Sequence, residues 1–448
     1  MQPNSVAKIV VRIFLTLLLA AAILSAPAQA QTFTVLHTFK GADGAEPIGV
    51  LVLDRAGNIY GTTGISGGGT RCPNFSNSGC GTAFMLNKAG KEVGLYSFDG
   101  TNGAGPYAGL LRDAAGNFFG TTIGGGTDGQ SCDGTQGYGC GVAFKLTKAG
   151  KETVYKFQGT PDGYFPESLL VEDPAGDLYG TTYLGGANGI GAVFKIDTKD
   201  GKETILHSFA GPPEGGGDGA FSYEGVIMDA AGNLYGVTSD GGSYGAGVVY
   251  ELKPGGEETL LYSFTGFSDG SGPDSVLLLD SQGNLYGTTA GGGNSCGVNG
   301  CGVVFELSPQ PGGTWAESVL YAFCSLPDCT DGQEPGSGPL VMDFAGNIYG
   351  TTYFGGAYRN CNGDGCGVVF KLDAAGKETV LHSFTGGSDG ASPVAGLAMD
   401  SSDNLYGTTQ GGGATCYPSL TCGVVFKITP VDHLASRSKI DGQPKLNL

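Results

Sequence analysis

Twelve cysteines stand in six close pairs, a spacing that could serve metal binding, thiol–disulfide exchange or a structural crosslink. A structural zinc site takes four ligands, and no pair has a further Cys or His beside it in the sequence. The Cys-x-x-Cys spacing of redox motifs is also absent. We therefore predict six local disulfides and an oxidising compartment. They are Cys72 with Cys80, Cys132 with Cys140, Cys296 with Cys301, Cys324 with Cys329, Cys361 with Cys366, and Cys416 with Cys422.

Five of these pairs lie in long glycine-rich loops, each of 12 to 18 residues. Two equivalent loops of 8 residues carry no cysteine, and Ile190 and Ala246 stand where the second Cys is expected. A long flexible loop loses much conformational entropy on folding, and a crosslink removes part of that loss. Closing loops of this size contributes roughly 2–2.6 kcal/mol each in the chain-entropy treatment. The distribution of the cysteines thus favours loop stabilisation.

Carboxylates form a second recurring group. The loop that joins one repeat to the next carries an Asp-Gly dipeptide in six of seven copies, and Asn102 takes the place of the aspartate in the seventh. A structural role in turns explains this pattern, but a ring of acids would also suit Ca²⁺, which prefers oxygen ligands. The string "NCNGDG" resembles the start of a calcium loop at Asn360, Asn362 and Asp364, although Lys371 stands where such a loop has Glu. We predict no cofactor, and Ca²⁺ is the one candidate. The six aspartates are Asp43, Asp162, Asp218, Asp269, Asp331 and Asp389.

Histidines give no catalytic pattern. His37, His207 and His382 share one repeat position, at which the other copies have Tyr, and this exchange indicates packing. We find no Ser-His-Asp, Cys-His or histidine–metal arrangement. Four glutamates depart from the repeat and could supply the acid pair of a glycoside hydrolase or lyase. They are Glu46, Glu167, Glu224 and Glu334.

Aromatic and polar residues that break the repeat are candidates for ligand binding. Sugars are bound by aromatic faces that lie beside carboxylates and amides. One loop carries Tyr353, Tyr358 and Arg359, and another carries Asp128, Asp133 and Tyr138. The alternative is that these are ordinary loop residues. The six residues define a candidate ligand-binding face.

A tandem repeat must position all these residues. The string "GNLYGTT" and its variants occur seven times, starting at residues 57, 116, 176, 232, 283, 346 and 403 (the last as "DNLYGTT", at Asp403). Each period has four strand-like segments, and no helical period is sustained. We predict an all-β fold, a seven-bladed β-propeller of four-stranded antiparallel blades. The chain opens on a fourth strand at 32–39 and ends on a third strand at 423–428, so the N-terminal strand should complete the last blade.

The sequence patterns at the two ends of the chain differ from that of the repeats. Residues 1–30 have a basic start, an apolar stretch and a small-x-small site, as a cleaved signal peptide does. We expect the propeller at 31–430 and a polar tail at 431–448. Removing Lys8 and Arg12 changes the formal charge from -19 to -21, which argues against nucleic-acid partners. We expect a secreted or periplasmic monomer without a membrane span.

The array resembles the Gloeo/Verruco tandem repeats of exported bacterial proteins. The matching strings are "GNLYGTT", "GVVFKL" and "GKETVLHSFTG", and they extend over roughly residues 32–430. The resemblance implies an exported propeller-like array and no defined reaction. The tail departs from the family, since it has neither a hydrophobic anchor nor a sorting signal.

The function we expect is non-enzymatic binding or scaffolding, with a carbohydrate, a cell-surface component or a protein as the partner. One alternative is an extracellular polysaccharide lyase or glycoside hydrolase. Another is a calcium-stabilised structural protein.

Overall fold

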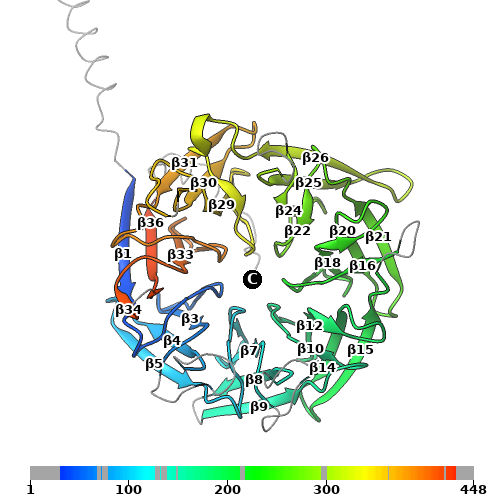
Figure 1. The fold of residues 1–448 in the computed structure, drawn as a ribbon. Helices are drawn as coiled ribbons and strands as arrows, with labels where there is room; N and C mark the ends of the chain where they lie inside the picture. The colour runs from blue at the N-terminus through cyan, green and yellow to red at the C-terminus, as the bar shows by residue number, and fades with distance from the viewer. Residues whose placement is uncertain are drawn as a thin grey trace, which may run out of the picture.

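The computed structural model describes residues 31–67, 72, 79–126, 132, 139–147, 150–211, 217–293, 300–361, 363–417 and 420–429. The expected signal peptide and the expected polar tail lie outside these residues. Seven antiparallel sheets stand around a central axis, as a seven-bladed β-propeller (Figure 1). The predicted fold class is confirmed. Among the described residues, no helix is both long enough and apolar enough to cross a membrane.

Each blade begins at the axis with a very short strand and proceeds outward. Blade 1 contains β2 (Val52–Leu53), β3 (Ile59–Thr63), β4 (Thr82–Leu86) and β5 (Glu92–Ser97). Blade 2 contains β6 (Leu111–Arg112), β7 (Phe118–Thr122), β8 (Val142–Thr147) and β9 (Gly150–Lys156). Blade 3 contains β11 (Val171–Glu172), β12 (Leu178–Thr182), β14 (Ala192–Asp197) and β15 (Lys202–Ser208). Blade 4 contains β17 (Val226–Met228), β18 (Leu234–Thr238), β20 (Val248–Leu252) and β21 (Glu258–Ser263).

In blades 5 and 6 a second short segment joins the inner edge of the sheet. Blade 5 contains β22 (Ser271–Pro273), β23 (Leu278–Leu279), β24 (Leu285–Gly291), β25 (Val303–Pro309) and β26 (Trp315–Ala322). Blade 6 contains β27 (Gln333–Pro335), β28 (Val341–Met342), β29 (Ile348–Phe354), β30 (Val368–Leu372) and β31 (Glu378–Ser383).

Blade 7 closes the ring with the two ends of the array. Three of its strands come from the C-terminal part: β32 (Ala398–Met399), β33 (Leu405–Thr409) and β36 (Val424–Thr429). Its outermost strand is β1 (Thr32–Thr38), which runs antiparallel to β36, with Thr32 opposite Thr429 and Thr38 opposite Val424. Figure 1 shows β1 in blue beside β36 in red. The predicted closure is confirmed, and it leaves the ring without an open blade.

An aspartate turn joins the first two strands of every blade. In blade 1, Asp54 accepts hydrogen bonds from the backbone N–H groups of Ala56 and Asn58, at 2.8 and 2.9 Å. Its second carboxylate oxygen accepts from the hydroxyl of Tyr60 at 3.0 Å. The turn is therefore capped by its own side chain, as the Asp-x-x-Gly-Asn string predicts.

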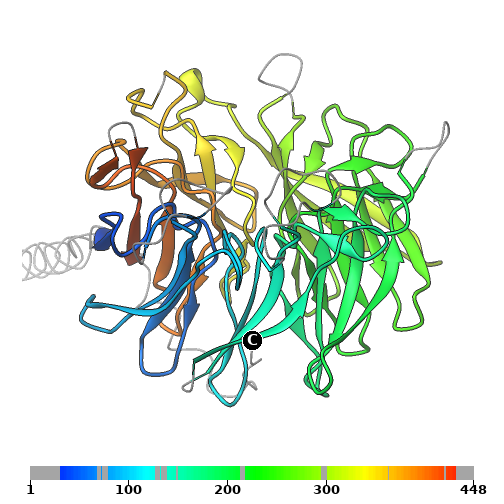
Figure 2. The same ribbon diagram turned by 60° about the horizontal axis from the view of Figure 1, so that its bottom comes forward.

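The loops between the second and third strands share one face with the connectors that enter each blade. The connector strand β10 (Gly163–Tyr164) pairs with the loop strand β13 (Leu184–Gly185), and β16 (Gly219–Ala220) pairs with β19 (Asp240–Gly241). In blade 7 the loop forms its own pair, β34 (Thr415–Tyr417) with β35 (Leu420–Thr421). A one-turn 3₁₀ helix, η1 (Pro327–Cys329), lies in the connector to blade 6. Figure 2 shows the depth of the blades and the loops above them. We call this side the loop face.

The hydrophobic core lies between the blades. A fully buried Phe of each outer strand packs edge-on against the third strand of the next blade, as Phe39 does against Phe84 with ring centroids 5.1 Å apart. All seven blade pairs repeat this contact at 5.0–5.3 Å. Gly61 makes room for it, because a Cβ there would lie 2.7 Å from the Phe84 ring. Such pairs stabilise by roughly 0.5–1.5 kcal/mol beyond their area.

A main-chain hydrogen bond also crosses every blade boundary. The N–H of Glu334 donates to the carbonyl oxygen of Cys301 at 2.9 Å, and six equivalent bonds complete the ring. The donor has a positive φ in all seven blades, including 55° at Glu46 and 56° at Phe165. Such a backbone is costly for residues other than glycine and persists where the surroundings enforce it. The acceptors are the carbonyl oxygens of Cys80, Cys140, Ile190, Ala246, Cys301, Cys366 and Cys422.

The acceptor of this boundary bond is a backbone oxygen in every blade. Ile190 and Ala246 therefore replace the cysteine of the other five blades without loss of the bond. Where the cysteine is present, its side chain is free to crosslink the loop. The same residue thus joins two blades through its main chain and stabilises a loop through its sulfur.

Candidate functional site

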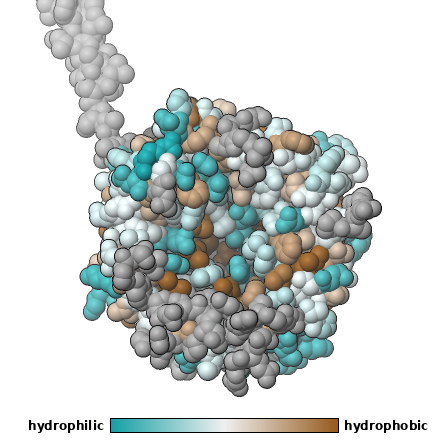
Figure 3. All heavy atoms as spheres, viewed as in Figure 1, coloured by the Kyte–Doolittle hydropathy of each residue, from teal (hydrophilic) through white to brown (hydrophobic). Residues whose placement is uncertain are grey.

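The mouth of the central channel is lined by one variable repeat position. It lies three residues before the buried Leu or Val of each innermost strand. The side chains here are partly exposed, while in six of the seven blades their neighbours on both sides, such as Pro166 and Ser168 around Glu167, are buried. Figure 3 shows a hollow at the centre of the ring, where hydrophilic and hydrophobic residues meet. The lining residues are Ile48, Tyr107, Glu167, Tyr223, Asp274, Ser337 and Val394.

Glu224 is the largest departure within the channel. It follows Tyr223, at a position where the other six blades have Gly, Ala or Ser. The hydroxyl of Ser337 hydrogen-bonds to the Glu224 carboxyl, although the two residues belong to blades 4 and 6. Only the channel allows side chains two blades apart to meet. Glu224 therefore reaches across the mouth.

Three carboxyl groups at the channel mouth have raised pKa values. Burial raises the pKa of Glu167 to about 7 and that of Asp274 to about 7. Burial, followed by the charges of Asp274 and Glu167, raises the pKa of Glu224 well above its usual range. Each group touches the channel but has protein on the other sides, which favours the neutral form. Near neutral pH the mouth thus presents at least one protonated carboxyl group beside ionisable ones.

The polar lining continues around the rest of the mouth. The hydroxyl of Tyr353 donates to Oε1 of Gln410 at 3.3 Å, and Gln410 hydrogen-bonds to the carboxyl of Glu46. Burial and the charges of Glu46 and Glu167 raise the pKa of the Tyr107 phenol to about 12. The charge of Glu334 acts on Asp274. All seven blades therefore contribute a polar side chain or a hydroxyl to one connected rim.

Aromatic rings form part of this rim. Tyr183 stacks on Tyr223 with ring centroids 4.2 Å apart. The ring of Tyr107 lies over Gly64, where an added Cβ would come within 2.1 Å of it. The φ of Gly64 is not in the left-handed region, so space alone requires glycine there. These rings give the mouth apolar faces next to its carboxyl groups.

The predicted ligand residues of blade 6 separate into two places. Tyr353 belongs to the channel mouth through its bond to Gln410. Tyr358 is 45% exposed at the rim of the loop face. Arg359 donates to the carbonyl oxygens of Gly363 and Asp328, and so joins its loop to the neighbouring connector. A role of Tyr358 and Arg359 in ligand binding stays a prediction.

Other predicted site residues are only partly visible. Asp128, Asp133, Tyr138 and Asn362 lie outside the described residues. The side-chain amide of Asn360 donates to the carbonyl oxygen of Thr385 at 2.9 Å. The charge of Asp364 acts on Glu334. A calcium ion at Asn360, Asn362 and Asp364 therefore stays a prediction.

The recurring Asp-Gly aspartates have a structural partner in each blade. The outer-strand His or Tyr of each blade hydrogen-bonds to the aspartate of the connector that follows it, as His207 Nε2 does with Asp218 at 2.8 Å. Tyr155 does the same with Asp162 at 3.0 Å. Asn102 donates to Tyr96 in the single blade without aspartate. The interpretation of the histidines as structural is consistent with these contacts.

Five of the six predicted disulfides are confirmed. In the four that crosslink a loop between the second and third strands, the second cysteine is at most 3% exposed. These buried residues are Cys80, Cys140, Cys366 and Cys422. Their sulfur atoms are oxidised and enclosed by protein, so they serve neither as ligands at the surface nor as reactive thiols. The five disulfides join Cys72 to Cys80, Cys132 to Cys140, Cys324 to Cys329, Cys361 to Cys366, and Cys416 to Cys422.

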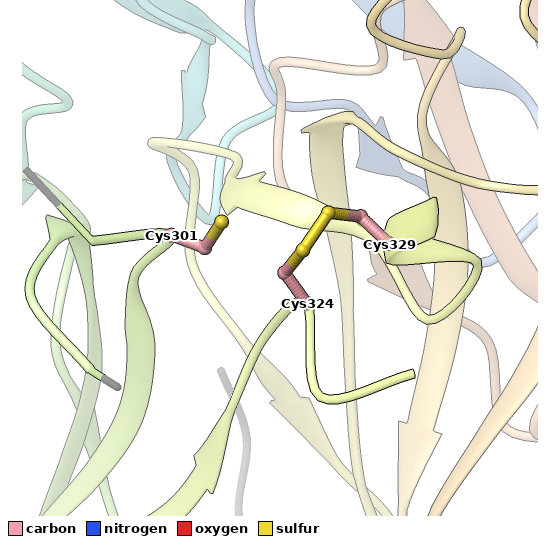
Figure 4. Close-up of side chains that lie close together, drawn as sticks. All are labelled: Cys301, Cys324 and Cys329. Atoms are coloured by element: carbon pink, nitrogen blue, oxygen red, sulfur yellow. A yellow bond between two sulfur atoms is a disulfide. The ribbon is translucent and has the colours of Figure 1, made fainter. Parts of the chain in front are cut away.

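Only one cysteine of the sixth predicted disulfide lies among the described residues. The partner predicted for Cys301 is Cys296, which lies outside the described residues, but Cys301 is disulfide-bonded. Figure 4 shows Cys301 beside the Cys324–Cys329 disulfide. The three sulfur atoms lie within 4.8 Å of one another, but none is a free thiolate that could bind zinc. Disulfides of this number are typical of exported proteins.

The Gloeobacter/Verrucomicrobia repeat matches residues 76–299 and 294–444. The chain belongs to this repeat family. The comparison with curated proteins found no match. Among solved structures, virginiamycin B lyase from Staphylococcus aureus is similar, with a TM-score of 0.53, 12% identity, and coverage of 89% of this chain and 99% of the other. A fungal alcohol oxidase of the AA5 family, in complex with copper, has a TM-score of 0.54, 14% identity, and coverage of 90% and 77%. At these identities the likeness concerns the fold alone.

Sequence reasoning found part of the channel mouth. Glu46, Glu167, Glu224 and Glu334 were identified by their departure from the repeat, and all four lie on the rim. Asp274, Tyr107 and Tyr223 were missed. The available signal was the variation of their shared position, which holds Ile, Tyr, Glu, Asp, Ser or Val while its neighbours hardly change.

Proposed function

We propose that the protein is an exported binding propeller whose channel mouth takes a neutral carbohydrate segment. What carries the proposal is the group of Glu167, Glu224 and Asp274, whose raised pKa values leave protonated carboxyls in a partly enclosed hollow. A protonated carboxyl donates a hydrogen bond, and an ionised one accepts, so together they suit hydroxyl groups that do both. The Tyr183–Tyr223 pair and Tyr107 add apolar faces for sugar C–H groups.

The acidic groups at the channel mouth indicate which class of glycan can bind there. The charges that act on Glu224 and Asp274 come from Glu167, Asp274 and Glu334, which are all acidic. An anionic polysaccharide would meet repulsion there, whereas a neutral one would not. A neutral glycan is therefore favoured over a uronate-containing one, and over a protein or cell-surface partner with an acidic contact.

The test is a glycan array that contains neutral and uronate-containing oligosaccharides, followed by titration calorimetry of the best binder. We expect a neutral glycan to bind and Glu224→Ser to weaken it about tenfold, which is about 1.4 kcal/mol. Phe344→Ala, in the aspartate turn of blade 6 and 96% exposed, is the matched control and should bind as the natural protein does. Preference for uronates, or equal binding by the Glu224→Ser variant, would contradict the proposal.

An acid–base reaction on a glycan is the second candidate. The observation that favours it is the group of three neighbouring carboxyls, Glu167, Glu224 and Asp274, whose pKa values are all raised by burial. A carboxyl whose pKa is raised toward neutral pH is suited to serve as a general acid. Release of reducing ends or unsaturated products by the natural protein, lost in Glu224→Gln, would favour a hydrolase or lyase. Binding without turnover would favour the first candidate.

A further inference from the structure

A ring of carboxyl pairs lies at the outer blade boundaries, away from the channel. In each outer strand, the residue four positions before the recurring His or Tyr lies opposite the connector of the preceding blade. Five blades have Glu at this position, and the connector opposite has the Asp-Gly aspartate. We call these contacts the Asp–Glu seams. They are Asp43 with Glu92, Asp162 with Glu203, Asp218 with Glu258, Asp269 with Glu317, and Asp331 with Glu378.

The glutamate of a seam lies close to the aspartate and is poorly supplied with hydrogen-bond donors, whereas the aspartate accepts from its connector, as Asp331 does from the backbone N–H of Ser325. The Glu203 carboxyl lies within hydrogen-bonding reach of Asp162. Ligand atoms of His207, Asp218 and Glu258 all lie within 4.8 Å of one another. One buried oxygen has no hydrogen-bond partner in four of the seams, Oε1 of Glu203, Glu258, Glu317 and Glu378. Two ionised carboxylates in such a place would repel each other, and a buried oxygen without a donor is costly.

The two remaining boundaries show that the two positions are linked. In blade 2 the equivalent residue is Lys151, and the residue opposite it is Asn102 in place of aspartate. The Lys151 amine donates to the carbonyl oxygen of Asn102. At the closing boundary the position holds Phe33, whose ring stacks on His382 at 3.7 Å. Glutamate therefore occurs at this outer-strand position only where the residue opposite is aspartate. A lysine at the same position would have formed an ion pair with that aspartate.

We propose that each Asp–Glu seam is bridged by a proton, so that the ring of blades is tightest in acid and loosens as the pH rises through neutrality. Tyr155, Tyr262 and Tyr321 donate to the aspartates of three seams, and His37 and His207 bond to those of the other two. The charges of His37 and His207 act on Glu92 and Glu258 and partly oppose the rise of their pKa values. In the described part of the chain, no lysine or arginine is among the groups acting on the five glutamates. At the three seams whose aspartate is bonded to tyrosine, the proton is thus the cation that the contact retains.

The acidity of the glutamates agrees with this arrangement. Burial, then the charge of Asp162, raises the pKa of Glu203 to about 8. Burial, then the charges of Asp269 and Asp331, raises the pKa values of Glu317 and Glu378 to about 7. The folded state therefore holds protons that the unfolded chain releases near its ordinary pKa of about 4.5. The stabilisation is complete below that pH and is lost as the pH rises through 7 to 8.

The test measures melting temperature against pH in the ligand-free protein. The natural protein should melt lower at pH 8.5 than at pH 5, by on the order of 5 °C for a chain of this size. In the double variant that combines Glu317→Gln and Glu378→Gln, an amide replaces the protonated carboxyl, and the difference should shrink. Glu257→Gln is the matched control, because Glu257 is exposed beside the seam residue Glu258 and should not change the difference.

Two results would overturn the proposal. One is a pH dependence that is the same in the double variant and in the natural protein. The other is a melting temperature at pH 8.5 that Ca²⁺ raises and EDTA lowers only when the two glutamates are present, because a metal ion would then occupy the seams. If the double variant does not fold, Glu317→Gln alone is compared, and the infrared band of protonated carboxyls at pH 7 must decrease. Since no glycan is present, failure here leaves the proposed binding function untouched.

Discussion

The amine of Lys151 lies 2.6 Å from the carbonyl oxygen of Asn102, at the one blade boundary where a cation replaces an acid. Burial lowers the pKa of this lysine to about 8. Asn102 offers the amine only a neutral oxygen, and the charge of Asp99 offsets part of the effect of burial. We expect Asn102→Asp to supply a carboxylate and to stabilise the fold by about 1 kcal/mol at pH 7. The urea midpoint measures this, with Asn102→Ala as the control, and a lower midpoint for Asn102→Asp would count against the seam assignment.

The cysteines should all be oxidised. We expect thiol titration of the unfolded, unreduced mature protein to find no free thiol, since five disulfides are formed and Cys301 is disulfide-bonded as well. Reduction should then release twelve thiols. Two or more free thiols before reduction would contradict the pairing.

The N-terminal strand should matter more for stability than the C-terminal tail. Deleting residues 31–40 removes β1, the partner of β36, and with it the buried ring of Phe39. Deleting 434–448 removes none of the blade strands in the described part of the chain. We expect a clearly lower melting temperature for the first truncation only. Equal melting temperatures would argue against closure of the ring by β1.

Replacement of Glu224 should weaken glycan binding and stabilise the folded protein at high pH. Glu224→Ser introduces a residue type that other blades already have at this position, and it removes a carboxyl that resists ionisation in the channel. Because the folded pKa is raised, the ionised form is penalised more as the pH increases. The variant should therefore be more stable than the natural protein at pH 9 and similar to it at pH 4. Denaturant titrations at the two values test this, and a variant that is less stable at pH 9 would show that Glu224 is structurally required.

The space above Gly64 should be needed by Tyr107. In Gly64→Ala the new methyl group would overlap the Tyr107 ring, at 2.1 Å from its nearest carbon, and should displace the ring from the mouth. Gly255→Ala is the matched control, because no atom lies within 4 Å of its added Cβ and its φ is also outside the left-handed region. We expect weaker glycan binding and a shifted tyrosine spectrum for the first variant alone. Unchanged binding would remove Tyr107 from the site.

The repeat made the fold predictable, and the departures from it only partly revealed the site. Strand order and closure followed from the phase of the segments at 32–39 and 423–428, because identical strings must occupy identical places. The disulfides followed from spacing. The contact of Glu224 with Ser337 could not be predicted, because it depends on the width of the channel. The sequence shows that Lys151 and Asn102 replace the Glu and Asp of the five seams. It does not show that the two residues are in contact, because that requires knowing that the outer strand of one blade faces the connector of the preceding one.

The hydrogen bond from the positive-φ residue of one blade to a carbonyl oxygen of the preceding blade has an evolutionary consequence. Both partners are main-chain atoms, and every repeat carries one donor and one acceptor, whether the acceptor residue is Cys301, Ile190 or Ala246. A duplicated repeat inserted into the gene would bring one donor and one acceptor and would form this main-chain bond with any neighbouring repeat. Ancestral arrays could thus have gained or lost whole units by recombination, while the side chains at the mouth diverged independently in each copy.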